Sequence, residues 1–413
     1  MLNLAIQFLT LLNGLIIGFA VPAIYGLTSY GAFVKEFALV FFLQKSVTIA
    51  TEPLLRIAGT QITTFSLALN LIIFSGIALF HAWFPAGAMT LLGTMLLSAS
   101  VLLILDGFRA RLAIALFLGS VAGLSVGILA WSYLSGGSLA IDQLIVASTL
   151  PCSTVALLYI FLRRVEAPTI KQGVRAIRSV VAATPQLLSV TAVFNLATNG
   201  FPFLLANSLA DRDLALFRVI TSLVQSFLFL LPINTRSLLA SFVREKATVR
   251  LYNTLQTTSL IYFSSLAMAA LLVGSYVPSI APLLSIVACV PSLCAALIAE
   301  RYLLSSGRIR EVAAVNIIVC SVSVVLLHYS STALHAELLY AGIFSFYAAA
   351  LNCLSEGRLT EPASVLLLFS PVAVWFGNVY LGFAALYLCG LIAFSFFVRR
   401  VSPGDVAGLW KTL

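Results

Sequence analysis

The chain has 413 residues, of which 61% are hydrophobic and 9% charged, and its mean hydropathy is +1.09. Soluble globular proteins carry about 25% charged residues, so this chain has too few charges to keep a folded surface of its size in water. The composition excludes a soluble enzyme and, despite the net charge of +9, a nucleic-acid-binding protein. Disorder is excluded because disordered chains are poor in apolar residues. A polytopic membrane protein remains.

The hydrophobic runs last about 18 to 25 residues, the length of a helix that crosses about 30 Å of hydrocarbon. Strands of a membrane barrel would alternate apolar and polar residues over about ten positions, and runs such as Leu102-Leu103-Ile104-Leu105 do not alternate. In lipid, a helix satisfies its own backbone hydrogen bonds. We therefore predict an all-α polytopic membrane protein.

About fourteen transmembrane helices are expected in chain order. They are predicted at residues 3–25, 32–51, 61–83, 87–106, 112–134, 143–162, 181–207, 214–240, 251–274, 277–299, 312–329, 334–354, 362–377 and 380–398. The last two form a tight pair around Gly377-Asn378, so twelve full crossings are the alternative. Both counts are even, which places the two termini on the same side of the membrane.

Basic residues give the orientation of the predicted helices. Every second loop, starting after the second helix, and the C-terminal tail together hold 18 of the 23 lysines and arginines, whereas the opposite loops hold Arg212 alone. This asymmetry indicates that the basic side and both termini are cytoplasmic. Most of the net positive charge therefore reflects topology.

A basic cytoplasmic segment divides the predicted helices into two six-helix lobes. The expected organisation is an N-lobe at residues 1–162, the linker at 163–180, a C-lobe at 181–355, and a C-terminal helix pair with a cytoplasmic tail at 356–413. Lys171, Arg175 and Arg178 recur at helical spacing, so the linker is either a short interfacial helix or a plain cluster of anchoring charges.

The two lobes carry similar segments. An offset of 183 residues pairs Lys35 with Arg218 at the start of the second and eighth helices, and the preceding helices contain Asn13-Gly14 and Asn199-Gly200. Pro202 is expected to kink or break its helix. Internal repeats of this kind place the substrate path of a transporter between the lobes.

Charged and amide side chains inside the predicted helices are the candidate substrate-binding residues, because polar groups in lipid are costly and usually face a cavity or a partner. Lys45 lies deepest in its helix, and Arg218, Gln225 and Arg236 are spaced to share one helical face. Snorkelling to water is the alternative for the basic residues, and hydrogen bonding between helices is the alternative for the amides. The full set is Asn13, Lys35, Lys45, Arg56, Asn195, Asn199, Arg218, Gln225 and Arg236.

No catalytic or metal-binding motif stands out. The six cysteines lie in apolar segments without a CxxC pair, and the three histidines lie at helix ends or loops on the outer side. The chain has no GxxxxGK phosphate loop. We expect no metal, no cofactor and no enzymatic activity.

At this point the chain resembles the bacterial O-antigen and polysaccharide-repeat flippases of the multidrug/oligosaccharidyl-lipid/polysaccharide superfamily. The resemblance lies in the six-plus-six layout with its basic linker and in two turns: Tyr25-Gly26-Leu27-Thr28-Ser29-Tyr30-Gly31 before the second helix, and Leu209-Ala210-Asp211-Arg212-Asp213-Leu214 before the eighth. The second turn lacks the glycine that the family has there.

The resemblance implies a transporter in the bacterial plasma (inner) membrane. It would move a polyprenyl-diphosphate-linked oligosaccharide from the cytoplasmic to the outer leaflet by alternating access. Lys35, Lys45, Arg218 and Arg236 would then compensate the phosphate charge. Expected partners are the lipid-linked oligosaccharide, membrane lipids and a polysaccharide polymerase complex, with no nucleic acid, and the expected state is a monomer.

Two alternatives stay open. A small-molecule or drug exporter of the same superfamily needs acidic residues in its lumen, and the only clearly intramembrane acid expected here is Glu36, beside Lys35. A membrane sugar polymerase or ligase would be expected to need a large outer loop, and the predicted outer loops are short.

Overall fold

The computed structural model describes five stretches of the chain and a few single residues. The described residues are 12, 16–35, 38, 171, 178, 192–229, 249–276, 281–356 and 362–399. All regular structure within them is helical, which confirms the predicted all-α class for this part of the chain. The total number of crossings stays a prediction, because the third to sixth predicted helices lie outside the described residues.

The chain divides into two compact units, Met1–Val219 (unit 1) and Ile220–Leu413 (unit 2). Each unit is described by itself. The predicted division into two lobes at residues 163–180 stays a prediction.

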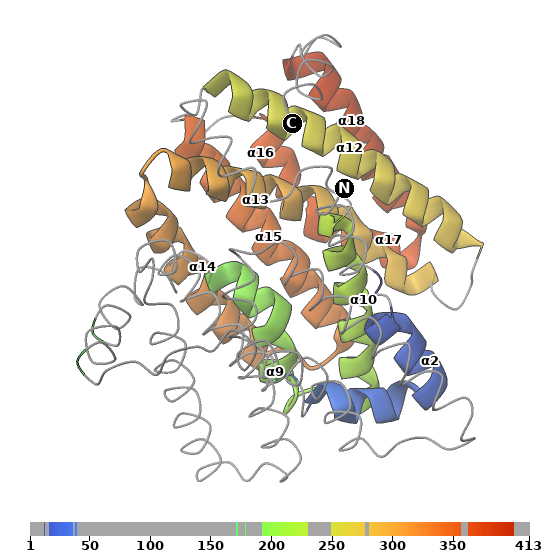
Figure 1. Cartoon of the computed structure of the whole chain (residues 1–413). Helices are drawn as coiled ribbons and strands as arrows, with labels where there is room; N and C mark the ends of the chain where they lie inside the picture. The colour runs from blue at the N-terminus through green and yellow to red at the C-terminus, as the bar shows by residue number, and fades with distance from the viewer. Residues whose placement is uncertain are drawn as a thin grey trace, which may run out of the picture. The chain divides into compact units, whose positions relative to one another are not determined.

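Two short irregular helices of unit 1 have the same local structure (Figure 1). The π-helical turn η1 (Ile16–Ala20) leads into α2 (Val21–Tyr25), and the π-helical turn η2 (Leu196–Gly200) leads into α9 (Phe201–Leu205). Each α-helix has a proline, Pro22 or Pro202, as its second residue. A proline has no N–H to donate to the preceding turn, so the helix widens or breaks there. Residues 192–205 are helical throughout, so the kink or break expected at Pro202 is present as a widened π-helical turn and not as an interruption of the helix.

Each irregular helix is followed by a turn and a further helix. Gly26 has a φ of 81°, a left-handed conformation that favours glycine, and residues 27–35 are helical. After α9, residues 206–210 form the turn that leads into α10 (Asp211–Phe229). Asp211 and Asp213 lie in the first turn of α10, where a negative charge favours the helix dipole.

Unit 2 is a bundle of antiparallel helices packed around one central helix. Every residue from 284 to 300 is buried, and this segment packs against α12, α15 and α17 (Figure 1). The elements are α12 (Val249–Ser275), the 3-10 helix η3 (Ala281–Cys289), α13 (Val290–Ser305), α14 (Ile309–His328), α15 (Ala333–Glu356), α16 (Pro362–Leu367), α17 (Ser370–Val379) and α18 (Leu381–Arg399).

Four segments in the described part of the chain are long and apolar enough to cross a membrane: Leu251–Val273, Leu284–Ser305, Ile309–His328 and Ala333–Ser355. Their bounds lie within a few residues of the predicted helices, except that the second begins and ends later than predicted. The buried share of the apolar stretch is 94% in Leu284–Ser305 and 28% in Ile309–His328. Leu284–Ser305 is therefore a core segment, whereas α14 exposes most of its apolar surface.

Candidate functional site

The irregular turn before α9 is tied to α10 by an arginine. In a regular α-helix the Thr198 carbonyl would accept the N–H of residue 202, but that residue is Pro202 and has none. The Arg218 side chain supplies a donor instead, since its Nη1 lies 2.8 Å from the Thr198 oxygen. A permanently charged guanidinium is thereby held against the irregular turn that contains Asn199.

The two turns that carry the family resemblance contact each other within unit 1. A Cβ added at Gly31 would overlap the backbone carbonyl of Asp211. The first turn therefore requires a glycine at this contact, and the second turn contributes the Asp211 backbone to it. Beside this contact Tyr30 is 1% exposed. Burial raises the pKa of Tyr30 to about 12, and the Arg218 charge acts in the opposite direction. Tyr30, Gly31, Asp211 and Arg218 therefore form one junction.

The described candidate residues occupy different environments. Arg218 belongs to the junction, and Asn195 is buried immediately before η2. The backbone of Asn199 lies in η2, whereas Lys35 is exposed at the end of helix 27–35. Asn13, Lys45, Arg56 and Arg236 lie outside the described residues. Their gathering into one cationic lumen stays a prediction.

Gln225 lies in the part of α10 that belongs to unit 2. Its Nε2 is buried and has no hydrogen-bond partner among the described residues. A buried amide donor without a partner costs about 1–3 kcal/mol. The position therefore suits a ligand, a water molecule or a residue outside the described part of the chain.

Two buried acids in unit 2 were missed by the sequence analysis. Glu300 of α13 is fully buried and Glu337 of α15 is 4% exposed, and both lie in segments able to cross a membrane. The expectation that Glu36 is the only clearly intramembrane acid is therefore wrong. Residue 337 falls within the predicted helix at 334–354, but its closeness to the helix end concealed its burial. Residue 300 lies just beyond the predicted 277–299 helix and beside Arg301, where it resembled part of a loop.

Glu300 has a specific partner. The Tyr347 hydroxyl of α15 donates to its Oε2 at 2.8 Å, and the Arg301 charge also acts on the carboxyl. Its other oxygen, Oε1, is buried without a hydrogen-bond partner among the described residues. Glu300 and Tyr347 thus join α13 to α15 through a buried polar contact.

A second polar network joins the same two helices, α13 and α15, to α12. The Gln256 Nε2 donates to the Ala295 carbonyl at 2.8 Å and contacts the Asn352 Oδ1 at 3.0 Å and the Tyr252 hydroxyl at 3.1 Å. The Tyr252 hydroxyl also donates to Asn352. This network connects α12, α13 and α15, while the Gln256 Oε1 is buried without a hydrogen-bond partner among the described residues.

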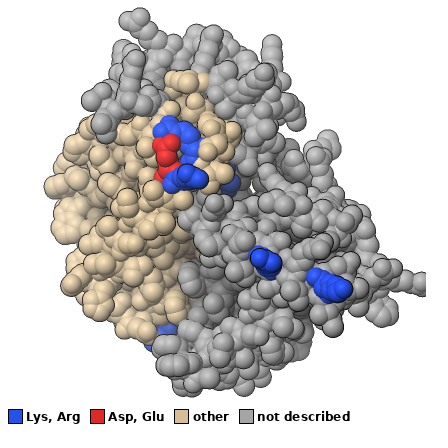
Figure 2. Space-filling model, turned by 90° about the vertical axis from the view of Figure 1, so that its left-hand side faces the viewer, with Lys and Arg blue, Asp and Glu red and all other residues tan. Residues whose placement is uncertain are grey.

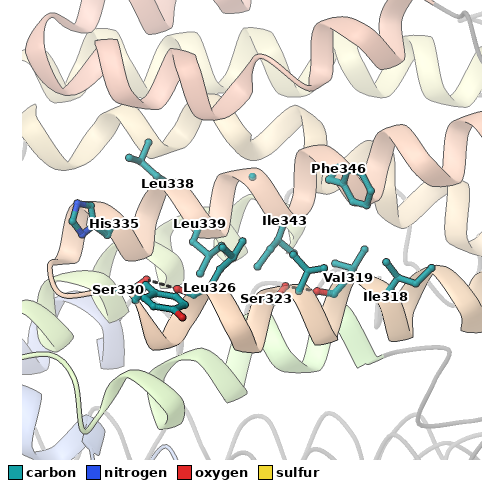
Figure 3. A pocket seen from close by; sticks show the side chains of 13 residues that line it. Ile318, Val319, Ser323, Leu326, Ser330, His335, Leu338, Leu339, Ile343 and Phe346 are labelled. Atoms are coloured by element: carbon teal, nitrogen blue, oxygen red, sulfur yellow. Dashed lines mark hydrogen bonds between the residues drawn. The ribbon is translucent and has the colours of Figure 1, made fainter.

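An apolar groove of about 700 Å³ lies between α14 and α15 (Figure 3). Its walls are mostly leucine, isoleucine and valine, and its polar groups lie mainly at one end, at Tyr329, Ser330 and His335. The Ser323 hydroxyl donates to the Val319 carbonyl of its own helix. The lining therefore suits a hydrocarbon chain and excludes the groove as the binding place of a diphosphate.

Charges are sparse on the tan surface that Figure 2 shows, which has one small group of red and blue side chains and a further blue side chain at its lower edge. The Arg308 guanidinium forms two hydrogen bonds with Glu311, and its Nη1 donates to the Leu354 carbonyl. These contacts tie the turn between α13 and α14 to the end of α15. Partly exposed ion pairs of this kind contribute little to stability.

Comparisons of the chain with protein-family models, curated proteins and solved structures find no match. The family resemblance stays a prediction.

Proposed function

We propose that this protein is a flippase that carries a polyprenyl-diphosphate-linked oligosaccharide from the cytoplasmic to the outer leaflet of the plasma membrane. The observation that carries the proposal is Arg218, a fixed positive charge held against the polar irregular turn at Thr198 in a chain otherwise built from apolar helices. A diphosphate needs such a charge in the membrane, and arginine can bind phosphate oxygens through two N–H groups.

The amides close to this turn suit the sugar part of this substrate. Asn199 follows Thr198 directly, and Asn195 precedes it by three residues. An amide both donates and accepts hydrogen bonds, as sugar hydroxyls do. The tail of the substrate is a hydrocarbon and remains in lipid. Outward movement of an anion is favoured by an inside-negative potential, by about 2.3 kcal/mol per charge per 100 mV.

The first experiment is deletion of the gene in its host, followed by mass spectrometry of the lipid-linked sugars on each face of the membrane. Complete repeat units should accumulate on the cytoplasmic face, and the intact gene should relieve the block. Units that reach the outer face without being polymerised would contradict the proposal and indicate a polymerase or ligase.

Arg218 either completes the hydrogen bonding of the irregular helix at Thr198 or binds the substrate. Replacement of Pro202 separates these two roles. Arg218→Ala should abolish complementation of the deletion strain while protein persists in the membrane, and Lys45→Ala should do the same. Pro202→Ala restores an N–H that can satisfy Thr198, so it should rescue Arg218→Ala if the arginine only completes the irregular helix. We expect no rescue, because the proposal assigns the charge to the substrate. Wild-type complementation by Arg218→Ala and Lys45→Ala would overturn the cationic site.

A second candidate function is a cation-coupled exporter of small molecules. The buried acids Glu300 and Glu337 favour it, because an acid inside the membrane can hold a proton or a metal ion during transport. If the deletion leaves all lipid-linked sugars unchanged, uptake and efflux of organic cations in the same strain become the deciding measurement.

A further inference from the structure

The groove between α14 and α15 is formed by one face of each helix. The lining residues of α14 recur every three or four positions, as do those of α15, which places each set on a single helical face. Figure 3 shows Ser330 and His335 at one end of the groove and Ile318 and Phe346 at the other. Ile318, Val322 and Phe346 are each more than half exposed. Both walls belong to segments able to cross a membrane, so the groove opens toward lipid.

The directions of the helices show which end of the groove lies at the membrane surface. Tyr252 of α12 stacks on Tyr302 of α13, and Gln256 of α12 donates to the Ala295 carbonyl of α13. Residue numbers rise along one helix as they fall along the other, so α12 and α13 are antiparallel. The three-residue turn 306–308 then reverses the chain between α13 and α14. It follows that α12 and α14 run in the same direction.

The helix α17 also runs in the direction of α14. A Cβ at Gly342 of α15 would lie 3.8 Å from the Pro371 Cγ of α17, and Asn378 of α17 lies beside the Glu337 carboxyl of α15. These two pairs show that α15 and α17 are antiparallel. The four-residue turn 329–332 makes α14 antiparallel to α15 as well. Hence α12, α14 and α17 end on the same side of unit 2.

Exposed tyrosines mark this side of unit 2. Tyr276, Tyr329 and Tyr380 directly follow α12, α14 and α17, and they are 86%, 73% and 68% exposed. Tyrosine is enriched where a membrane meets water, because its ring is apolar and its hydroxyl is polar. The opposite side carries Arg308 and Arg310 at the start of α14. Tyr329 therefore places one end of the groove at a membrane surface, which the predicted orientation identifies as the outer one.

The groove is about as long as one leaflet is thick. Ile318 and Tyr329 are eleven residues apart in sequence, a distance of about 17 Å along a helix. The hydrocarbon core of a membrane is about 30 Å thick, so the groove extends from the surface to near the middle of the membrane. Its occupant therefore has an apolar chain that fits one leaflet and a polar head beside Tyr329, Ser330 and His335.

The lining residues also limit the charge of this head. Among the described residues that line the groove there is no lysine, arginine, aspartate or glutamate. Anionic lipids are attracted by lysine and arginine near the membrane surface, and a diphosphate needs the same positive groups. The hydroxyls of Tyr329 and Ser330 and the imidazole of His335 can instead hydrogen-bond a phosphate whose charge is balanced within the lipid itself. The lining therefore favours a zwitterionic head.

We propose that the groove between α14 and α15 binds a zwitterionic phospholipid of the outer leaflet, with one acyl chain between the two helices and the phosphate beside Tyr329 and His335. The protein buries 28% of the apolar stretch of α14. A bound acyl chain covers part of the remainder and contacts α15 at the same time. This lipid is a structural ligand and not the transported substrate.

The test is native mass spectrometry of the purified full-length protein, with identification of the lipids that it retains. The wild type should retain one phosphatidylethanolamine. Val322→Trp places an indole at a 52% exposed position inside the groove and should lower this retention about tenfold, which corresponds to about 1.4 kcal/mol. The matched control is Val324→Trp on the same helix, at a 45% exposed position outside the groove lining, and it should retain the lipid as the wild type does.

A second measurement shows whether the bound lipid stabilises the protein. After removal of lipid, added phosphatidylethanolamine should raise the unfolding temperature of the wild type and of Val324→Trp by a few degrees more than phosphatidylglycerol with the same acyl chains does. Val322→Trp should not show this difference. Both variants change exposed positions, so both should fold.

The lipid site fails under any of five results. Equal retention by the two tryptophan variants would place the lipid elsewhere, and a wild type that retains no lipid would show that the groove holds only exchanging lipid. Preference for phosphatidylglycerol would contradict the zwitterionic head. A retained polyprenyl lipid would assign the groove to the transported substrate, and a lipid-free dimer would assign it to a second copy of the chain. None of these readouts is transport, so the lipid site and the flippase proposal are tested separately.

Discussion

The two ends of unit 2 treat a buried acid in different ways. At one end, Glu300 accepts a hydrogen bond from Tyr347 and has Arg301 as its sequence neighbour. At the other end, Glu337 is 4% exposed, and the polar side chain that acts on its carboxyl is the uncharged Asn378 of α17. Similar apolar helices therefore enclose one acid beside a positive charge and one acid beside a neutral amide.

This comparison separates the two acids by the cost of their charge. A buried carboxylate beside a positive charge is partly compensated, whereas a buried carboxylate without a basic partner is strongly unfavourable. Substitutions at the two ends should therefore differ in size and in sign.

The largest effect is expected for Tyr347→Phe. It removes the hydroxyl that donates to Glu300 at 2.8 Å and leaves a buried carboxylate oxygen without that donor, which should cost about 2–3 kcal/mol. Unfolding in detergent, compared with Tyr276→Phe at an 86% exposed position, measures the difference. Equal stability of the two variants would show that the Glu300 end is not held by this bond.

A smaller loss is expected for Gln256→Leu. The substitution removes the contacts of Nε2 with Tyr252, Ala295 and Asn352 but keeps the direct bond between Tyr252 and Asn352, so the cost should be about 1–2 kcal/mol. The same unfolding assay applies. An unchanged stability would show that these contacts of Gln256 do not hold the three helices together.

Glu337→Gln should shift stability in the opposite direction. The amide carries no charge, so removal of a buried carboxyl whose polar neighbour is the uncharged Asn378 should stabilise the protein by about 1 kcal/mol. Glu300→Gln, by contrast, should destabilise under the same conditions, since it weakens a charged hydrogen bond. Two variants with shifts of the same sign would remove the distinction between the two ends.

The smallest effect is expected for Glu311→Gln. Glu311 pairs with Arg308 near solvent, where water and salt screen the interaction. Stability should change little, and the small change should disappear at high salt. A large, salt-independent loss would show that this surface pair is structurally essential.

The sequence predicted the local features that follow from residue type. Runs of apolar residues gave the bounds of the helices from α12 to α18 to within a few residues for most, because helix length in a membrane is set by hydrocarbon thickness. Pro202 predicted an irregular helix, since any proline removes a backbone donor, and the structure shows the irregularity as a π-helical turn. The similarity of the segments around Pro22 and Pro202 extends to their π-helical turns.

The candidate site was less accessible from sequence. Arg218 was named as a candidate residue from its sequence position alone. Its hydrogen bond to the Thr198 carbonyl depends on how η2 lies beside α10. The acids were misjudged, because position along a helix does not reveal which face another helix covers. Glu337 lies two residues after the exposed His335 and is itself buried.

The sequence by itself determined the membrane class, the positions of the described helices and the positive charge expected on one side, because hydropathy and charge act residue by residue. Only the tertiary structure decided that Gly31 meets Asp211, that Tyr347 bonds Glu300, and that Asn378 lies beside Glu337. These contacts join residues far apart in the chain. Their geometry depends on helix rotation and register, which apolar side chains specify through shape and not through hydropathy.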